Sequence, residues 1–286
     1  MKKLIKALFA TTLFTAIPFT VIKAQAMSVS PQNWWVGMQN EALQVMLHEP
    51  NIAKQQWQLI PYNGVKLISI SKTDNPNYAF LNLKITPQAK PGDLVFTSPT
   101  GERFEYPLHT RSSNSAKRKG FNSQDTLYLI NPDRFVNGDS SNDTAAGMLE
   151  AADPKSKGGR HGGDLQGVIN ALPYLNDLGV TQLWLTPALE NNMPSYSYHG
   201  YAITDFYNID PRMGSNELYQ ELSNKAQQQG IGLVMDFVLN HFGSEHVWMS
   251  GKPSSDWINV NGECAYGKYA TSHARQTIQD PHASQF

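Results

Sequence analysis

The chain has 286 residues, a length typical of about two domains, and its 40% apolar and 16% charged content allows a sizeable core and argues against disorder. The formal net charge is −1, from 23 basic and 24 acidic side chains, so no field of one sign could hold nucleic acid or an anionic membrane. The single cysteine, Cys264, excludes an internal disulfide and a cysteine-rich metal site.

The first residues predict an export signal. A basic start with Lys2, Lys3 and Lys6 precedes a threonine-interrupted apolar stretch, and small residues at 24–26 (Ala-Gln-Ala) offer a cleavage site. The alternative, a transmembrane anchor, needs about 20 apolar residues, and this stretch is shorter. We therefore predict a signal peptide over residues 1–26 and a mature chain outside the cytoplasm, with no membrane span.

Short β-rich runs make up the next part of the chain. Residues 43–47, 65–70 and 78–85 alternate in polarity or are rich in strand-forming side chains, and turn sequences at 63–64 (Asn-Gly), 74–76 (Asp-Asn-Pro) and 90–93 (Lys-Pro-Gly-Asp) separate or follow them. This pattern predicts an immunoglobulin-like β-sandwich domain over residues 27–110. A polar linker is predicted at 111–123, and we interpret its basic run as solvated rather than as a nucleic-acid patch.

After Gln124 buried strands alternate with amphipathic helices. Strands are predicted at 126–130, 181–185 and 233–238, and this order is typical of right-handed βαβ units in a parallel sheet. Three strands cannot close a barrel, so residues 124–286 are expected to be the first part of a TIM (β/α)8 barrel, truncated after strand three, or else a smaller fold. The apolar face of the first predicted helix consists of Val168, Ile169, Leu172, Leu175 and Leu178. The second predicted helix begins after an N-cap at Ser215, and its apolar face consists of Leu218, Leu222 and Ala226.

In a (β/α) barrel the active site lies at the carboxyl ends of the strands, and three polar clusters fall there. The first, after strand one, crowds four oxygen-bearing side chains into one turn-rich loop. Calcium takes about six to eight oxygen ligands, so a calcium site is one interpretation. The alternative is a polar turn in which Asp164 is a plain helix N-cap. The candidate ligands are Asn137, Asp139, Asn142, Asp143, Gly162 and Asp164.

The second and third clusters follow strands two and three. The loop at 196–205 is rich in tyrosine and could stack on a sugar ring, or it could be a packed loop with buried rings. Asp236 lies inside an apolar strand, where a carboxylate is costly to bury without a partner such as Arg or His. We favour an active-site role over a structural ion pair. Zinc is the competing interpretation, because His241 and His246 flank Glu245, but no zinc-protease motif fits.

These clusters together resemble the α-amylase family of glycoside hydrolases (family 13). The similarity is to its cyclomaltodextrinase, neopullulanase and maltogenic amylase group, including neopullulanases of Bacteroides-type starch utilisation. Residues 236–241 match its D-x-V-x-N-H region, 198–201 match its Y-H-G-Y loop, and 137–139 with 163–164 match its calcium loop. Residues 31–38 resemble the start of its N-terminal β-sandwich.

The resemblance implies roles for particular residues. Tyr201 would stack on the sugar at the cleavage point, His199 and His241 would hydrogen-bond its hydroxyls, and Asp236 would orient the catalytic centre. Asn240 would be structural, and the cofactor would be Ca²⁺. Members of the family are retaining, with two carboxylates about 5 Å apart.

The family's catalytic acids come from strands four, five and seven, which lie beyond residue 286. This polypeptide is therefore expected to be inactive, while its parent hydrolyses α-1,4-glucans such as maltodextrin, cyclodextrin or pullulan by double displacement. Alternatives are a non-catalytic α-glucan-binding protein and a zinc hydrolase. The resemblance also favours a periplasmic location over an extracellular one, and it leaves open a homodimer formed through the N-terminal domain.

Overall fold

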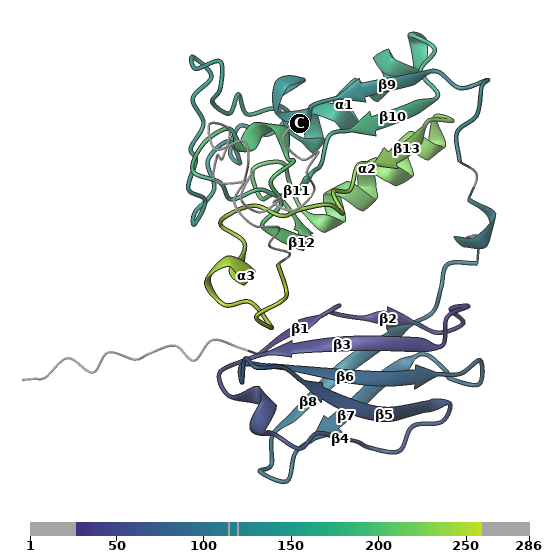
Figure 1. The fold of residues 1–286 in the computed structure, drawn as a ribbon. Helices are drawn as coiled ribbons and strands as arrows, with labels where there is room; N and C mark the ends of the chain where they lie inside the picture. The colour runs from purple at the N-terminus through teal and green to yellow at the C-terminus, as the bar shows by residue number, and fades with distance from the viewer. Residues whose placement is uncertain (1–26, 114, 119, 259–286) are drawn as a thin grey trace, which may run out of the picture.

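The computed structural model describes residues 27–113, 115–118 and 120–258, so the predicted signal peptide and Cys264 lie outside the described residues. Within those residues, none of the helices combines the length and the apolar character needed to cross a membrane. Figure 1 shows two units, a β-sandwich and a strand–helix unit, joined by the chain that passes from β8 to β9.

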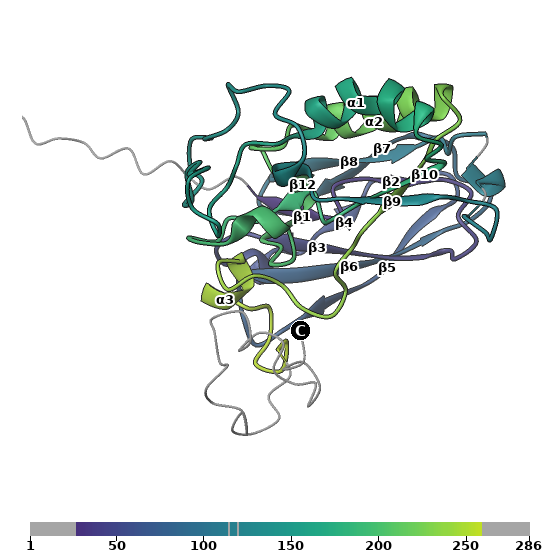
Figure 2. The same cartoon turned by 90° about the horizontal axis from the view of Figure 1, so that it is seen from above.

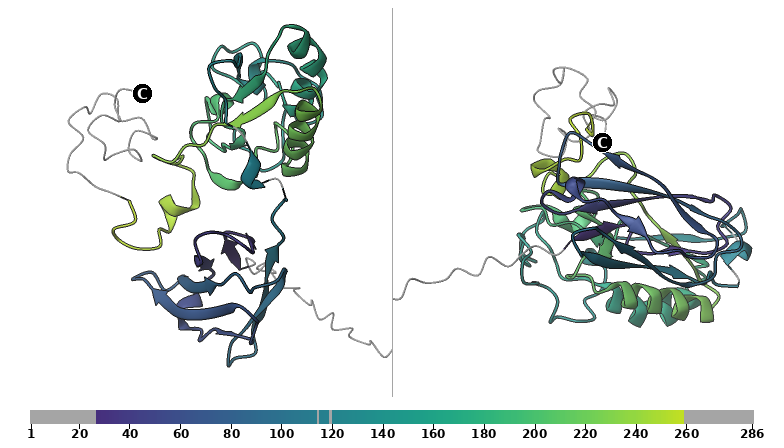
Figure 3. Two further views of the ribbon diagram at one scale, coloured as in Figure 1. Left: turned by 90° about the vertical axis from the view of Figure 1, so that its right-hand side faces the viewer. Right: turned by 90° about the horizontal axis from the view of Figure 1, so that it is seen from below.

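The N-terminal unit is a sandwich of two four-stranded sheets (Figures 1 and 3). One sheet has the order β1-β3-β6-β5 and the other β2-β8-β7-β4, and their facing sides share one apolar core. The three runs that the sequence predicted as strands lie in β3, β5 and β6. The bounds are β1 Ser28–Ser30, β2 Trp34–Trp35, β3 Ala42–His48, β4 Gln58–Leu59, β5 Val65–Lys72, β6 Tyr78–Ile85, β7 Gly92–Thr97 and β8 Arg103–His109.

Alternation of polarity explains why β3 has one buried face. Leu43, Val45 and Leu47 are buried, and the residues between them are exposed or half-buried, because successive side chains of a strand point to opposite sides. β6 is the central strand between β3 and β5 and is buried along most of its length, which fits its nearly continuous apolar sequence.

The strand–helix unit is built on a parallel sheet of β9 (Leu127–Ile130), β10 (Gln182–Leu185) and β13 (Gly232–Met235), in the order β13-β10-β9. Helices α1 (Leu165–Asp177) and α2 (Asn216–Gln228) lie side by side along this sheet (Figure 2). As predicted, Ser215 caps α2, its hydroxyl accepting from the N–H of Leu218.

Two details of this unit differ from the sequence predictions. Leu178 was placed on the buried face of the first helix, but α1 ends at Asp177, so Leu178 is the C-cap residue and is 52% exposed. The third strand was predicted to reach Val238, but it ends at Met235. The pairing of β10 with β13 stops at Leu185–Met235, because β10 ends there and runs into Pro187, which has no N–H to donate.

The short elements β11 (Leu189–Glu190), β12 (Asp205–Ile209) and α3 (Val247–Ser250) were not predicted. The loop around α3 forms a second connection between the two units. Tyr78 donates its hydroxyl to Gly251 O, and the side-chain amide of Asn75 donates to Lys252 O at 2.8 Å. The segment after β13 is therefore fastened to the sandwich, in addition to the linker at 111–123.

Candidate active site

The three polar clusters meet at one edge of the parallel sheet. β10 pairs in register with β9 and with β13, so the last residues of the three strands stand side by side. The polar loop (residues 131–164) leaves from β9, and the aromatic loop (residues 196–201) follows β10 and β11. Asp236 is the first residue after β13. The strand ends therefore bring together side chains that are up to about a hundred residues apart in sequence.

Tyr201 and Asp236 form the centre of this site. The Tyr201 hydroxyl donates to Asp236 Oδ2 at 3.0 Å, and the indole Nε1–H of Trp184 donates to the same oxygen at 3.2 Å. Burial, followed by the hydrogen bond to Asp236 and its charge, raises the pKa of Tyr201 to about 12. The phenol therefore stays protonated at neutral pH and holds the carboxylate in one orientation.

Among the described residues, Tyr201 and Trp184 are hydrogen-bond partners of Asp236, and the Arg or His partner expected from the sequence stays a prediction. Because β13 ends at Met235, the carboxylate is half-buried rather than enclosed in a strand, and the neutral donors of Tyr201 and Trp184 contact it. Trp184 was missed because its strand was interpreted as buried throughout, whereas the indole is 39% exposed. Its position between two buried leucines in a period-two pattern was the available signal.

The two predicted histidines hold the main chain of Tyr201 from either side. His199 Nδ1 accepts from the N–H of Tyr201 at 2.9 Å, and His241 Nε2 donates to the carbonyl oxygen of Tyr201 at 2.9 Å. The His199 and Tyr201 rings lie 5.9 Å apart and are tilted by 31°. All four predicted substrate-binding residues therefore lie in one hydrogen-bonded group.

This group offers a flat apolar ring surrounded by polar atoms. Tyr201 is 39% exposed, its hydroxyl is bonded to the Asp236 carboxylate, and the His199 ring lies 5.9 Å from its ring. A hexose in its chair form has an apolar face of C–H groups and an equatorial belt of hydroxyls. An exposed aromatic face with hydrogen-bonding groups at its edge suits such a ligand.

In the polar loop, Asp164 is a helix N-cap, which was the alternative interpretation of this residue. Its Oδ1 accepts from the N–H of Gly167 at 2.6 Å, and its Oδ2 accepts from the N–H of Asp139 at 2.7 Å. The N–H of Gly138 lies within 3.2 Å of both oxygens. The carboxylate is fully buried and fixes the polar loop against the first turn of α1.

Two of the other candidate calcium ligands, Asn137 and Asp143, lie against Gly162. Asn137 Nδ2 donates to Asp143 Oδ1 at 2.7 Å, and a Cβ built on Gly162 would lie 2.7 Å from that oxygen. Asn142 Oδ1 is buried, and within the described part of the chain no donor reaches it. Asp139 accepts two bonds inside its own turn. Ca²⁺ prefers carboxylate, amide and carbonyl oxygens as ligands, and Asn142 Oδ1 is an oxygen of this kind that no hydrogen-bond donor of the described residues contacts.

Four buried charges lie beneath these loops. Asp210 and Arg212 form a two-bond ion pair at 2.7 and 2.9 Å, and Arg160 lies 3.7 Å from Asp133 and 3.9 Å from Asp210. Burial alone would raise the pKa of Asp210, but the hydrogen bonds from Arg212 and the charge of Arg160 lower it below its ordinary value. The network joins the polar loop to the segment after β12.

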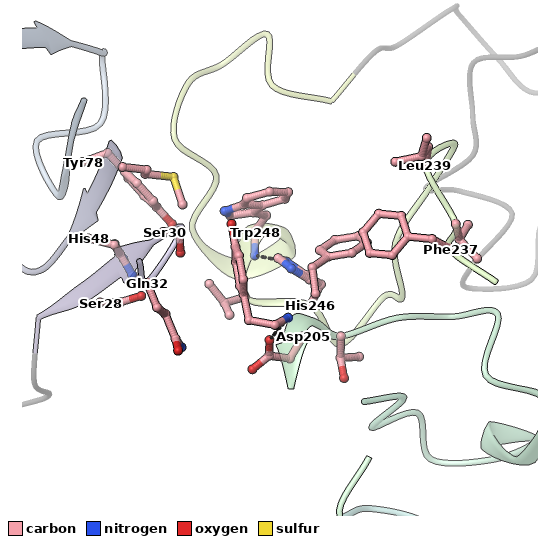
Figure 4. A pocket seen from close by; sticks show the side chains of 16 residues that line it. Ser28, Ser30, Gln32, His48, Tyr78, Asp205, Phe237, Leu239, His246 and Trp248 are labelled. Carbon is pink, nitrogen blue, oxygen red and sulfur yellow. Dashed lines mark hydrogen bonds between the residues drawn. The ribbon is translucent and has the colours of Figure 1, made fainter. Parts of the chain in front are cut away.

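A cleft of about 470 Å³ lies between the sandwich and the strand–helix unit (Figure 4). His48 and Tyr78 line it from the sandwich, and His246 and Trp248 line it from the loop around α3. His246, one of the histidines considered for zinc, accepts from the N–H of Trp248 and so caps α3. Groups of three or more His, Cys, Asp or Glu side chains able to hold a metal do not occur among the residues that the structure describes.

The comparisons with known proteins agree with this architecture. The profile described as "Alpha amylase, catalytic domain" matches residues 129–283, and "Cyclomaltodextrinase, N-terminal" matches residues 28–112. The sandwich thus corresponds to a cyclomaltodextrinase-type N-terminal domain, and the strand-end site lies in part of an amylase-type catalytic domain. The chain belongs to the α-amylase family.

Known relatives from three bacteria are similar to parts of this chain. The chain is 41% identical over 163 residues to neopullulanase 2 of Thermoactinomyces vulgaris, covering 54% of this chain and 27% of that protein. It is 38% identical over 141 residues to cyclomaltodextrinase of Thermoanaerobacter pseudethanolicus (47% and 24%) and 36% identical over 158 residues to β/α-amylase of Paenibacillus polymyxa (53% and 13%). The chain therefore spans between 13% and 27% of the length of these relatives.

Proposed function

We propose that the protein to which this chain belongs hydrolyses α-1,4-linked gluco-oligosaccharides, such as maltodextrin, cyclodextrin or pullulan. The observation that carries the proposal is the hydrogen-bonded group of Tyr201, Asp236, His199 and His241 at the strand ends. In this proposal the Tyr201 ring stacks on a glucose unit, and the two imidazoles, which hold the main chain of Tyr201 from either side, fix that ring beneath the sugar. Asp236, fixed by Tyr201 and Trp184, orients the reacting sugar.

The proposed chemistry is retaining double displacement, in which one carboxylate attacks the sugar and a second carboxylic acid, about 5 Å away, protonates the leaving oxygen. The family places those acids on strands four, five and seven. The 286-residue polypeptide would then bind a glucan and leave it uncut, since no covalent glycosyl-enzyme can form without the nucleophile.

The purified 286-residue chain is therefore expected to bind maltoheptaose without cleaving it. Tyr201→Ala should weaken binding about tenfold, equivalent to ~1.4 kcal/mol, because it removes the stacking ring and one donor to Asp236. Calorimetric titration gives the affinity, and chromatography of the sugar detects cleavage. Tyr174→Ala is the control, because Tyr174 is 62% exposed and lies on α1. Equal affinities for the two variants, or release of shorter sugars above a buffer blank, would contradict the proposal.

We further propose that the polar loop binds Ca²⁺. The proposed ligands are side-chain oxygens of Asn137, Asp139, Asn142 and Asp143 and the carbonyl of Gly162, with Asp164 holding the loop or adding a carboxylate oxygen. Asn142 Oδ1, which is buried and has no hydrogen-bond donor in the part of the chain that the structure describes, supports this assignment. When bound, the cation would neutralise carboxylate charge in the loop and fix its fold.

Calcium is expected to stabilise the chain against unfolding. At a hundred times the dissociation constant, binding to the folded state alone adds about 2.7 kcal/mol, which scanning calorimetry would register as a higher midpoint. Mg²⁺ should give a smaller shift, because it requires near-octahedral geometry and loses its water reluctantly. Asp143→Asn should remove most of the Ca²⁺ shift, and Asp153→Asn, at an exposed position of the same loop, should keep it. Equal Ca²⁺ shifts in the two variants would rule out this site.

The location and the assembly are also proposals. A relative, the periplasmic α-amylase of Escherichia coli, is 39% identical over 129 residues, covering 41% of this chain and 19% of that protein. Together with the signal-like residues 1–26, this supports export to the periplasm. A homodimer through the sandwich would be in keeping with the cyclomaltodextrinase-type N-terminal domain.

A further inference from the structure

The aromatic loop contains little regular structure of its own. Its only regular element is the 3₁₀ turn Ser197–His199, which Tyr196 (φ 58°) and Gly200 (φ 81°) flank in left-handed conformations. A non-glycine residue such as Tyr196 adopts this conformation only at a cost, so contacts from outside the loop must hold it there. Those contacts decide where His199 and Tyr201 lie.

The polar loop supplies the most direct of these contacts through Glu150. Its Oε1 accepts from the N–H of Tyr196 at 3.1 Å, and its Oε2 accepts from the N–H of Ser197 at 2.7 Å. Amides at the start of a helical turn have no partner within the turn, so one carboxylate satisfies both. The carboxylate is thus bonded to the strained residue and to the first residue of the turn.

Glu150 is itself held rigidly. Its carbonyl oxygen accepts from Arg212 Nη1 at 2.8 Å, and Arg212 is fully buried and bonded to Asp210. The neighbouring N–H of Leu149 donates to Asn192 Oδ1 at 2.7 Å. The carboxylate therefore projects from a fixed point, as a positioning group must.

Two further contacts bind the next residues of the aromatic loop to the polar loop. Arg160 Nη1 donates to the hydroxyl of Ser197 at 3.2 Å, and the Arg134 guanidinium lies 3.8 Å from the centre of the Tyr198 ring. Arg134 is fixed in turn by the carboxylate of Asp133 at 3.0 Å. Residues 196, 197 and 198 are thus each contacted by the polar loop, immediately before His199 and Tyr201.

We infer that Glu150 is a positioning residue for sugar binding, because its carboxylate sets the backbone of the loop that presents His199 and Tyr201. The ligand in this inference rests on the proposed function, but the geometry of the loop does not. Without the carboxylate, two amides lose their acceptor and the aromatic loop samples other conformations. Affinity for the sugar then falls in proportion to the fraction of chains that keep the binding-competent arrangement.

The test compares Glu150→Ala and Glu150→Gln with Asp153→Asn, which removes one negative charge from an exposed position of the same loop. Hydrogen exchange of the segment 194–201, without sugar, is expected to be about tenfold faster in Glu150→Ala and close to wild type in Asp153→Asn. Glu150→Gln should fall between them, because one of the two carboxylate oxygens is replaced by an NH2 group, which cannot accept from an amide. Unchanged exchange in Glu150→Ala would overturn the inference.

The second measurement is the dissociation constant for maltoheptaose, taken at a temperature at which circular dichroism shows every variant folded. A residue that only adds stability leaves this constant unchanged, whereas a positioning residue raises it, here by about five- to tenfold for Glu150→Ala. Affinity equal to wild type despite faster exchange would also overturn the inference. If the wild-type chain binds no maltoheptaose while exchange responds as described, the loop-positioning role stands and the proposed sugar ligand is wrong.

Discussion

Replacing Arg212 with methionine is expected to lower the free energy of unfolding of the strand–helix unit by about 3–5 kcal/mol. Arg212 and Asp210 are both fully buried, and the guanidinium satisfies both carboxylate oxygens as well as the carbonyls of Glu150 and Asn191. Methionine fills much of the same volume, so the main loss is electrostatic. Of the charged side chains that the structure describes, the Asp210 carboxylate would then keep Arg160, at 3.9 Å, as its partner.

Chemical denaturation followed by circular dichroism measures this change. Lys225→Met is the matched control in the same unit, because Lys225 also forms a 2.7 Å ion pair, with Glu221, but both side chains are nearly half exposed. Exposed pairs of this kind contribute about 0.3–0.5 kcal/mol. Comparable losses in the two variants would mean that the buried pair does not hold these loops together.

Much of the fold could be predicted from the sequence because local patterns dominate it. Period-two alternation in β3 and the apolar run of β6 specify strands whatever surrounds them. Ser215, followed by apolar residues at helical spacing, specifies the start of α2. The end of β13 was predicted wrongly, because it depends on where its partner β10 stops, and the apolar sequence continues beyond that point.

The candidate site was predictable as a set of residues and much less as a set of contacts. Parallel strands bring their carboxyl ends to one edge, so the convergence of Tyr201, Asp236 and His241 followed from topology and motif together. Period-two alternation could have indicated that Trp184 faces away from its buried neighbours, but it does not identify Asp236 as its partner, and no local pattern indicates Glu150 as the acceptor for the aromatic loop. Both contacts join segments 46 to 52 residues apart and depend on side-chain geometry rather than on periodicity.

Acid is expected to destabilise the chain through His246. Burial lowers the pKa of this imidazole to about 4, although the charge of Asp205 acts in the opposite direction. In the unfolded chain the pKa is about 6.5, so the stabilising contribution of the neutral ring is complete above that pH. As the pH falls from about 6.5 to 4, the unfolded state binds a proton at this imidazole and the folded state does not. The free energy of unfolding therefore falls by up to about 3 kcal/mol.

The physical cause is the ring cluster around His246. Its imidazole lies 4.5 Å from the Trp248 ring and 4.9 Å from that of Phe242, and it is 7% exposed, so a charged form would be poorly solvated. Its Nδ1 also accepts from the N–H of Trp248, a role that a protonated ring cannot fill. Protonation of His246 would thus destabilise both the buried position of its ring and the N-cap of α3.

The variant His246→Asn separates this titration from the others. Asparagine is a good N-cap acceptor and does not titrate, so the variant should keep α3 while losing the pH dependence assigned to His246. Unfolding free energies measured at several pH values between 7 and 4 should therefore fall less steeply in the variant. His48, across the cleft, also has a pKa lowered by burial, and its contribution cancels in the comparison. Parallel curves for the two proteins would show that the ring cluster tolerates the imidazolium and that acid acts elsewhere.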